Sequence, residues 1–404
     1  MKTINGGVTA PKGFKASGVH CGIRKNKSKT DLALILAECD CSAAAVYTTN
    51  RVKAAPVYIT QQNLKNGMAR AIIANSGNAN ACAPNGEENA ARMCRAVAEH
   101  TGISAGDVIV NSTGVIGQPL PIENIESAVP ELVKELSATG GGSAAKAIMT
   151  TDTMEKEIAV SFELGGVEVK IGAIAKGSGM IHPNMATMLS FVTTDCAISP
   201  EMLQTALSRS AKATYNRISV DGDTSTNDMN AVLASGLAGN KRIAFENEDF
   251  AAFQTALDFV NLHLAKLIAK DGEGATHLIQ CTVTGAADTD SAEKLSMSVI
   301  SSSLTKAAMF GADANWGRVL CAMGYSGVEF DPEKVDVSFE SDIGSVMVCR
   351  DGRGLPFDEE KAKEILLRKE ITILCDMKTG SASANAYGCD LTYDYVKING
   401  DYRT

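Results

Sequence analysis

The 404-residue chain has few aromatic residues and no long apolar segment. Phe, Trp and Tyr together make up 5% of the residues, while Gly accounts for 36 positions and hydrophobic residues for 45%. No run reaches the roughly 18 apolar residues of a membrane-spanning helix, and the N-terminal Met-Lys-Thr-Ile-Asn-Gly-Gly has no apolar stretch of signal-peptide length. We therefore expect a globular, cytoplasmic protein that does not bind membranes.

The chain also lacks an excess of positive charge. It carries 38 Lys and Arg against 47 Asp and Glu, a net charge of -9. Such a chain repels a phosphate backbone, and no stripe of cations offsets this locally, so nucleic acid is not an expected partner. The one basic cluster, Arg24 to Lys29, is diluted by Asn and Ser and is interpreted as a solvated turn.

Patterns for metals and disulfides are missing as well. The eleven cysteines are odd in number and scattered, unlike a disulfide framework. Cys39-Asp40-Cys41 has no second pair at zinc spacing, and the five histidines are dispersed. Asp221 to Ser225 begins like a calcium loop, but Thr226 replaces the required Gly and Val232 the required Glu. We predict no metal site.

Hydrophobic patterning predicts a mixed α/β fold in two or three domains, since a chain of this length exceeds the usual limit of one core. Strands are predicted at 31–36, 69–74, 107–110 and 188–194, and a hairpin at 157–162 and 167–174 around Leu164-Gly165-Gly166. Helices are predicted at 87–100, 122–136, 200–213 and 249–270. Asn75 to Asn78 and Asn111 to Gly114 are interpreted as turns that end two strands.

The last third of the chain is predicted to form a smaller α/β unit. Strands are expected at 278–283, 335–339, 345–349, 371–375 and 391–397, with a helix at 359–367. The predicted domains are therefore 1–278 and 279–404. Two glycine-rich segments, Gly140 to Ser143 and Lys176 to Gly179, match no P-loop and are interpreted as flexible loops.

One segment carries a specific resemblance. Spacing alone would not single out Thr187, because a Thr at the start of a strand is ordinary. The stretch from Lys176 to Phe191, however, closely resembles the self-cleavage region of the ArgJ family, the ornithine acetyltransferases. Further matches follow in order along the whole chain: 7–14, 49–51, 54–56, 74–81, 112–117, 219–228, 271–276, 313–318 and 398–404.

The resemblance implies that the chain cuts itself between Ala186 and Thr187 and that both pieces, 1–186 and 187–404, stay associated. Thr187 would then be the catalytic nucleophile, and its freed α-amine, with a reference pKa near 8, can accept the hydroxyl proton. The family's oxyanion hole corresponds to Thr113 and Gly114. On the residues alone, Ser112-Thr113-Gly114 is equally well explained as a turn.

The implied reaction is a ping-pong transfer of acetyl from N2-acetylornithine to glutamate, which gives ornithine and N-acetylglutamate. Acetyl-CoA is a further candidate donor, and no bound cofactor is expected. The family's substrate contacts correspond to Thr150, Lys176, Thr187, Glu273, Asn399 and Thr404. Lys176 is a candidate partner of a substrate carboxylate, and Glu273 with the terminal carboxylate of Thr404 a candidate site for the ornithine ammonium.

The resemblance also implies a fold and an assembly. The expected fold is the DmpA/ArgJ-like sandwich of two β-sheets between helical layers, plus a smaller C-terminal α/β domain whose tail reaches the active site. A heterotetramer of two α and two β chains is expected. Two other functions remain open at this point: an aminopeptidase of the related DmpA type and an uncleaved metabolite-binding protein.

Overall fold

The computed structural model describes residues 1–182 and 188–400. These form two compact units. The described residues of the first unit fall in 1–177, 188–216 and 224–268, and those of the second in 178–182, 217–223 and 269–400. Two short segments, 178–182 and 217–223, thus belong to the second unit although first-unit residues follow each of them in the chain. The predicted domain boundary at 278 stays a prediction.

The first unit contains one nine-stranded sheet among the residues that the structure describes. Its order is β1-β6-β7-β8-β10-β3-β4-β5, with β2 paired to β3. The strands are β1 (Lys2–Ile4), β2 (Phe14–Val19), β3 (Leu32–Tyr47), β4 (Met68–Asn78), β5 (Val108–Val115), β6 (Lys156–Leu164), β7 (Val167–Lys176), β8 (Leu189–Thr194) and β10 (Met229–Ala234).

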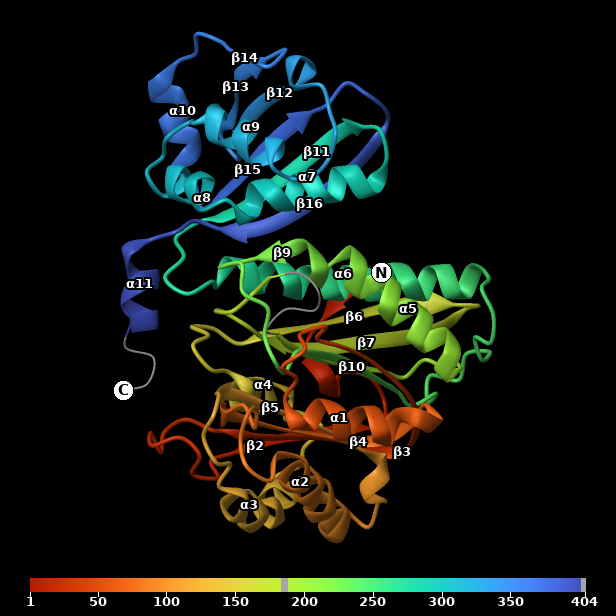
Figure 1. Ribbon diagram of the computed structural model, residues 1–404. Helices are drawn as coiled ribbons and strands as arrows, with labels where there is room; N and C mark the ends of the chain where they lie inside the picture. The colour runs from red at the N-terminus through yellow and green to blue at the C-terminus, as the bar shows by residue number, and fades with distance from the viewer. Residues whose placement is uncertain (183–187, 401–404) are drawn as a thin grey trace. The chain divides into compact units, whose positions relative to one another are not determined.

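The long strand β3 joins two halves of this sheet. Its first part pairs with β2 and β4, the register shifts between Leu36 and Cys41, and its last part pairs with β10. A strand that changes partners at such an irregularity lets a sheet fold over itself. Ile35 and Ile72 from one half and Ile174 and Phe191 from the other form one buried cluster between the layers. Figure 1 shows β6, β7 and β10 in one layer and β2 and β4 in the other.

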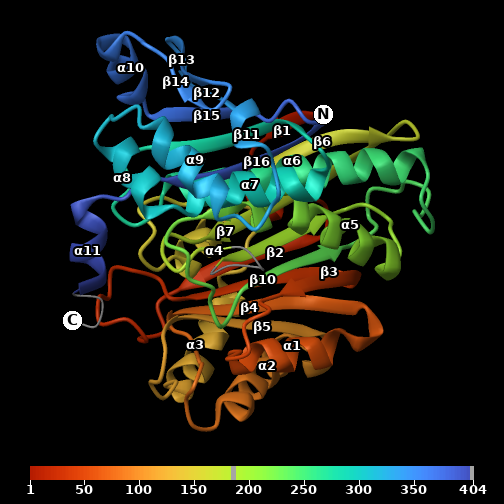
Figure 2. The same cartoon turned by 45° about the horizontal axis from the view of Figure 1, so that its top comes forward.

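Helices cover both outer faces of the folded sheet. On the β4–β5 half lie α1 (Ala55–Asn63), α2 (Gly86–Thr101) and α3 (Ile122–Lys134), with Ile73, Met93 and Ile125 in a common core. On the other half lie α5 (Pro200–Ala213) and α6 (Glu248–Lys270), as Figures 1 and 2 show. There the rings of Phe162 on β6 and Phe253 on α6 are 6.5 Å apart. The predicted sandwich between helical layers is confirmed, as two halves of one continuous sheet.

Several predicted elements are confirmed in detail. The hairpin of β6 and β7 turns at Gly165 and Gly166, whose φ values of 55° and 81° suit a two-residue turn that favours glycine.

The glycine-rich segment 140–143 was wrongly interpreted as a loop, because it begins α4 (Gly141–Ile148). A Cβ on Gly140 would lie 1.8 Å from the Ala16 carbonyl oxygen, so close packing on the neighbouring strand explains this glycine.

The two predicted Asn-Ser turns are wrong. Strands β4 and β5 run on through these residues and pair in parallel, with Asn75 opposite Ser112 and Ser76 opposite Thr113. Their polar side chains bind backbone groups instead of ending the strands: Ser76 Oγ, for example, donates to the Ala147 carbonyl oxygen at 2.7 Å. Turn-forming residue types are therefore accommodated inside the sheet because each half of the pair supplies the other's hydrogen bonds.

The second unit is built on a seven-stranded sheet, again counted over the described residues. Its order is β14-β13-β12-β15-β11-β16-β9. The strands are β9 (Ile218–Ser219), β11 (Leu278–Ala286), β12 (Asp336–Ser341), β13 (Gly344–Arg350), β14 (Arg353–Gly354), β15 (Glu370–Asp376) and β16 (Ala382–Cys389). The helices are α7 (Thr289–Ser301), α8 (Ser303–Phe310), α9 (Trp316–Gly324), α10 (Glu359–Leu366) and α11 (Tyr393–Gly400).

The predicted strand at 391–397 is wrong, because residues 393–397 lie in α11 and residues 391 and 392 precede it outside any strand. The alternation of Leu391, Tyr393 and Tyr395 resembles a strand with one buried face. In the structure the alternate residues share no such face, since Tyr393 is 86% exposed. On this side of the sheet β16 pairs with the two-residue edge strand β9, and β16 ends just before the helix. In the part of the chain described, no helix is long and apolar enough to cross a bilayer.

Candidate functional site

The first group of candidate residues centres on Thr113, near the end of β5. Its side chain is buried, and its Oγ1 accepts a hydrogen bond from Lys176 Nζ at 3.4 Å. Lys176 ends β7, which belongs to the opposite half of the sandwich. A hydroxyl has two lone pairs and one hydrogen, so accepting from lysine leaves the Thr113 O–H available as a donor. Two of the predicted site residues are thus brought together.

Gly114 follows Thr113 in a backbone conformation that favours glycine. Its φ is 134°, and an added Cβ would lie 2.3 Å from the carbonyl carbon of Gly77 on β4. The register of β4 and β5 shifts immediately beyond this pair. A bulge of this kind turns backbone groups out of the regular ladder, which is how a strand end can present an N–H to a ligand. The role of Gly114 as an oxyanion donor stays a prediction.

Asp152 connects Thr150, a further predicted residue, to the backbone beside Lys176. Its Oδ2 accepts from the backbone N–H of Thr150 at 2.9 Å, and its Oδ1 accepts from the N–H of Gly177, next to Lys176, at 2.7 Å. The same Oδ1 accepts from Lys156 Nζ at 2.7 Å, and both charged side chains are fully buried. Burial alone raises the pKa of Asp152, but the positive charges of Lys176 and Lys156 lower it to about 2. Asp152 is therefore ionised at neutral pH.

Sequence reasoning missed Asp152 and Lys156. The available signal was an acidic and a basic residue four positions apart just before a predicted strand. Such spacing normally indicates a weak, solvated ion pair on a helix. Only the tertiary structure shows that this pair is buried and that the carboxylate also binds the backbone of Thr150, a predicted contact, and of Gly177, the neighbour of Lys176.

Asp228 is a second buried acid that sequence reasoning left without a role. It lies directly before β10, and its Oδ1 accepts from the backbone N–H of Met188 at 3.1 Å. Burial raises the pKa of Asp228 well above its ordinary value, although the charge of Lys176 opposes this. Met188 is the first described residue after the predicted nucleophile in the chain. Asp228 therefore fixes the start of the segment that leads into β8.

Unsatisfied polar atoms accompany these residues. Asn75 Oδ1 and Ser112 Oγ are buried and have no hydrogen-bond partner among the described residues. The two side chains occupy paired positions on β4 and β5, next to Thr113. Buried polar atoms are rarely left unpaired without a reason such as a bound water or ligand. The strand pair that carries Thr113 thus has spare hydrogen-bonding capacity.

The second group of candidate residues lies within the second unit. Asn399 Nδ2 on α11 donates to Glu273 Oε2 at 2.7 Å and to the Tyr395 carbonyl oxygen at 3.0 Å. A Cβ on Gly179 would lie 2.4 Å from the Glu273 carboxylate, so a side chain at this position would displace that carboxylate. Glu273 and Asn399, both predicted as substrate contacts, are therefore joined by a side-chain hydrogen bond.

Asp221 and Tyr395 extend this second group. Asp221 accepts from the backbone N–H groups of Met180 and Ile181 at 2.6 and 2.9 Å, and the Tyr395 hydroxyl donates to it at 3.3 Å. Burial raises the pKa of Asp221, and burial together with the Asp221 charge raises that of Tyr395. Asp221 therefore links the backbone at Met180 and Ile181 to α11 through Tyr395. Sequence reasoning considered Asp221 only as part of a calcium loop.

Three predicted residues cannot be placed. Ala186, Thr187 and Thr404 lie outside the described residues. The remaining predicted residues fall into two sets: Thr113, Gly114, Thr150 and Lys176 in the first unit, and Glu273 and Asn399 in the second. Within the described ranges, no group of three or more His, Cys, Asp or Glu side chains could hold a metal ion.

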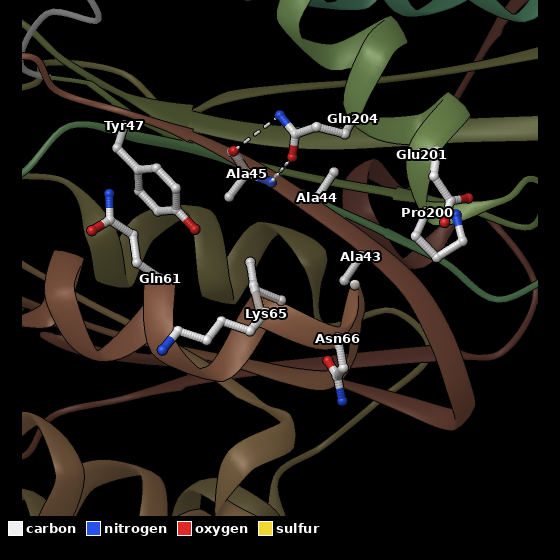
Figure 3. A pocket seen from close by; sticks show the side chains of 12 residues that line it. Ala43, Ala44, Ala45, Tyr47, Gln61, Lys65, Asn66, Pro200, Glu201 and Gln204 are labelled. Atoms are coloured by element: carbon white, nitrogen blue, oxygen red, sulfur yellow. Dashed lines mark hydrogen bonds between the residues drawn. The ribbon is translucent and has the colours of Figure 1, made fainter.

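A separate cavity of about 430 Å³ lies in the first unit and contains no predicted site residue. It is lined by residues of β3, α1 and α5 and the turn after α1 (Figure 3). There β3 has parted from β4, and Gln204 of α5 takes the place of a neighbouring strand. Its side-chain amide accepts from Ala45 N at 3.3 Å and donates to Ala45 O at 3.2 Å. The cavity is explained by this splaying of the sheet.

Comparison with known proteins gives matches along the whole chain. The pattern that defines the ArgJ family matches residues 15–404. The chain is 52% identical over 406 residues to the arginine biosynthesis bifunctional protein ArgJ of Symbiobacterium thermophilum and 51% identical over 405 residues to that of Caldanaerobacter subterraneus, with 100% of each chain covered. A crystal structure of the ArgJ protein from Bacillus halodurans is 47% identical with a TM-score of 0.51, covering 53% of this chain and 99% of its own.

Proposed function

The chain belongs to the ArgJ family of acetyltransferases, and we propose that it moves acetyl from N2-acetylornithine to glutamate in arginine biosynthesis. The observation that carries this proposal is the buried contact between Lys176 and Thr113. It places a hydroxyl donor and a fixed positive charge at the end of β5, where the resemblance assigns the oxyanion hole. Donors held in a buried site stabilise developing negative charge more strongly than water does.

The proposed reaction has two half-reactions. Thr187 Oγ attacks the acetyl carbonyl of N2-acetylornithine, the amide C–N bond breaks, and ornithine leaves with the proton that the Thr187 amine had taken from the hydroxyl. The α-amine of glutamate then attacks the acetyl ester, releasing N-acetylglutamate and restoring the hydroxyl. In both steps the Thr113 O–H and the Gly114 N–H are the proposed donors to the oxyanion.

The nucleophile requires a prior cut between Ala186 and Thr187. In the intact chain the nitrogen of Thr187 is an amide and cannot accept a proton, whereas a free amine can. The crystallised Bacillus halodurans chain supports this step, because it matches over 99% of its length and yet covers only 53% of this chain. A piece from 187 to 404 is likewise slightly more than half of the chain.

The proposed substrate contacts are Thr150, Lys176, Thr187, Glu273, Asn399 and Thr404. N2-acetylornithine and glutamate both carry an α-carboxylate, and Lys176 is the proposed cation that binds it. Asp152 supports this assignment, since it binds the backbone N–H groups of Thr150 and of Gly177 beside Lys176. Glu273, held by Asn399 at 2.7 Å, is the proposed partner of the ornithine side-chain ammonium.

The proposal also covers the second acetyl donor, the need for a cofactor, and the assembly and location of the protein. Acetyl-CoA is proposed as a second acetyl donor, in keeping with the word bifunctional in the names of the similar proteins. No bound cofactor is required, because both half-reactions are acyl transfers through Thr187. The two pieces are proposed to stay together as a heterotetramer of two α and two β chains in the cytoplasm.

The decisive experiment compares the natural chain with Thr187→Ala and Thr187→Ser. The natural chain should give two bands on a denaturing gel, one for residues 1–186 and one for residues 187–404. N-terminal sequencing of the second piece should begin Thr-Met-Leu-Ser. It should also form N-acetylglutamate from N2-acetylornithine and glutamate. Thr187→Ala should stay one inactive chain, while Thr187→Ser should retain cleavage because it keeps the hydroxyl.

Three results would contradict the proposal. Release of amino acids from peptides, without transfer of acetyl to glutamate, would identify an aminopeptidase of the related type instead. A natural chain that remains intact, binds a metabolite and transfers nothing would identify an uncleaved binding protein. Two fragments from Thr187→Ala would show that another group cuts the chain.

A further inference from the structure

The strongest feature outside the proposed reaction centre is the basic loop, residues 20–30 between β2 and β3. It carries Arg24, Lys25, Lys27 and Lys29 and contains no acidic residue, in a chain whose net charge is -9. Residues 25–29 are all exposed. No ion pair joins Lys25, Lys27 or Lys29 to a carboxylate within the described part of the chain. Three neighbouring ammonium groups are thus left to solvent without compensating charge.

The base of this loop is fixed by one buried acid. Asp31, fully buried, accepts from the backbone N–H groups of Cys21 at 2.6 Å and Arg24 at 2.9 Å. The backbone oxygen of Asp31 accepts from the N–H of Ser76 on β4 at 2.9 Å. A carboxylate that binds two backbone groups of a loop sets where the loop leaves the sheet. The loop is therefore attached to the segment of β4 that pairs with Ser112 to Gly114.

Arg24 brings the loop next to the proposed reaction centre. Its guanidinium donates to the carbonyl oxygen of Met149, the neighbour of Thr150. Its Cγ lies 3.2 Å from where a Cβ of Gly77 would stand, and Gly77 is paired with Gly114. The basic loop thus starts from the strand pair that carries the proposed oxyanion hole, while its lysines extend into solvent.

We propose that Lys25, Lys27 and Lys29 bind the phosphate groups of acetyl-CoA, an inference that rests on the proposed use of this second donor. Acetyl-CoA carries a neutral thioester at one end and about four negative charges on its phosphates at the other, near neutral pH. An acidic protein repels such a molecule unless a local cationic site attracts it. Exposed lysines suit this task, because an ammonium binds phosphate as a mobile point charge.

The reaction step itself is the one already proposed. Thr187 Oγ attacks the thioester carbonyl, the C–S bond breaks, an acetyl ester forms, and the hydroxyl proton passes through the Thr187 amine to the departing CoA sulfur. Glutamate then takes the acetyl group as before. N2-acetylornithine carries one negative and one positive charge and no phosphate, so the three lysines act on one donor and not on the other.

This difference between donors gives the test. The variant Lys25→Gln/Lys27→Gln/Lys29→Gln should raise KM for acetyl-CoA about tenfold, since three exposed charge pairs together supply roughly the free energy of one factor of ten. Its KM and kcat with N2-acetylornithine should match those of the natural chain. The matched control Lys361→Gln/Lys363→Gln/Lys369→Gln removes three exposed charges from the second unit and should leave both donors unaffected.

Titration with CoA itself, followed by calorimetry at low and at moderate salt, gives an independent readout. CoA affinity of the natural chain should fall as salt rises, and the loop variant should lose most of this dependence. Unchanged acetyl-CoA kinetics in the loop variant, equal loss with both donors, or the same loss in the control would overturn the inference. A natural chain active only with N2-acetylornithine would also overturn it while leaving the main reaction intact, whereas inactivity with both donors would refute the proposed function.

Discussion

Replacement of Asp152 by Asn tests the most consequential contact that the structure reveals. The Asp152 carboxylate binds Lys156 Nζ at 2.7 Å, with both side chains fully buried, and also two backbone N–H groups. The amide introduced by Asp152→Asn is neutral, so Lys156 would lose the carboxylate charge that binds its Nζ at 2.7 Å. Removing one partner of a buried pair typically costs about 3 to 5 kcal/mol. We expect Asp152→Asn to lower the free energy of unfolding by that amount at pH 7.

The lowered pKa of Asp152 gives a second value for its stabilisation of the fold and shows how that stabilisation depends on pH. A pKa lowered from 3.8 to about 2 corresponds to about 2.5 kcal/mol of stabilisation. A depressed acid contributes this stability fully above its unfolded pKa of 3.8 and loses it as the pH falls toward 2. The natural carboxylate should therefore stabilise the fold equally at pH 5 and pH 7 and progressively less between pH 4 and pH 2.

The assay is urea unfolding in the Thr187→Ala background, which we expect to be a single chain and so better suited to two-state treatment. Glu246→Gln is the matched control, because it breaks an exposed pair with Arg209 and should cost at most about 1 kcal/mol. Adding Lys156→Met to Asp152→Asn should recover most of the loss. A cost no larger than that of the control, or no recovery in the double variant, would refute the buried-pair reasoning.

Three further predictions concern the proposed oxyanion hole and the proposed substrate contact Glu273. Thr113→Val keeps the side-chain shape but removes the hydroxyl, and kcat for acetyl transfer should fall about a hundred- to a thousandfold in steady-state assays. Gly114→Ala would place a Cβ 2.3 Å from backbone, so soluble, active protein should be lost, whereas Gly142→Ala, with open space around it, should behave like the natural chain. Gly179→Ala would displace the Glu273 carboxylate, 2.4 Å from the new Cβ, and should raise KM for N2-acetylornithine. Unchanged kinetics in Thr113→Val or Gly179→Ala, or normal yield of Gly114→Ala, would contradict these assignments.

Much of the fold could be predicted because periodic apolar patterns are local. The hairpin of β6 and β7 is an example, since alternating residues flank Gly165-Gly166, and a two-residue glycine turn admits one register. The helix from Pro200 to Ala213 is another, because Ser199 caps it by accepting from Met202 N. In both cases the signal and the structure that it specifies lie within the same few residues.

The errors have a common physical cause. Asn75-Ser76-Gly77 and Asn111-Ser112-Thr113 have the composition of turns, and each would form one if it stood alone. They are strands because each segment pairs with the other, although more than thirty residues separate them in sequence. The segment 391–397 shows the converse. Its alternating pattern predicts a strand, but β16 already pairs with β11 on one side and with β9 on the other, and residues 393–400 form α11 instead.

The same reasoning explains which site residues sequence patterns can reveal. Thr113 and Lys176 come from strands in opposite halves of the sandwich, so no spacing along the chain could predict their contact. The family resemblance identified both as site residues, because proteins that share an ordered set of motifs also share the tertiary arrangement that brings those motifs together. Asp152 and Asp228 act differently. They bind backbone N–H groups beside Lys176 and beside Thr187, and neither residue fits a sequence pattern for catalysis. A residue that holds backbone next to a reacting group can be recognised only once the fold has brought the two together.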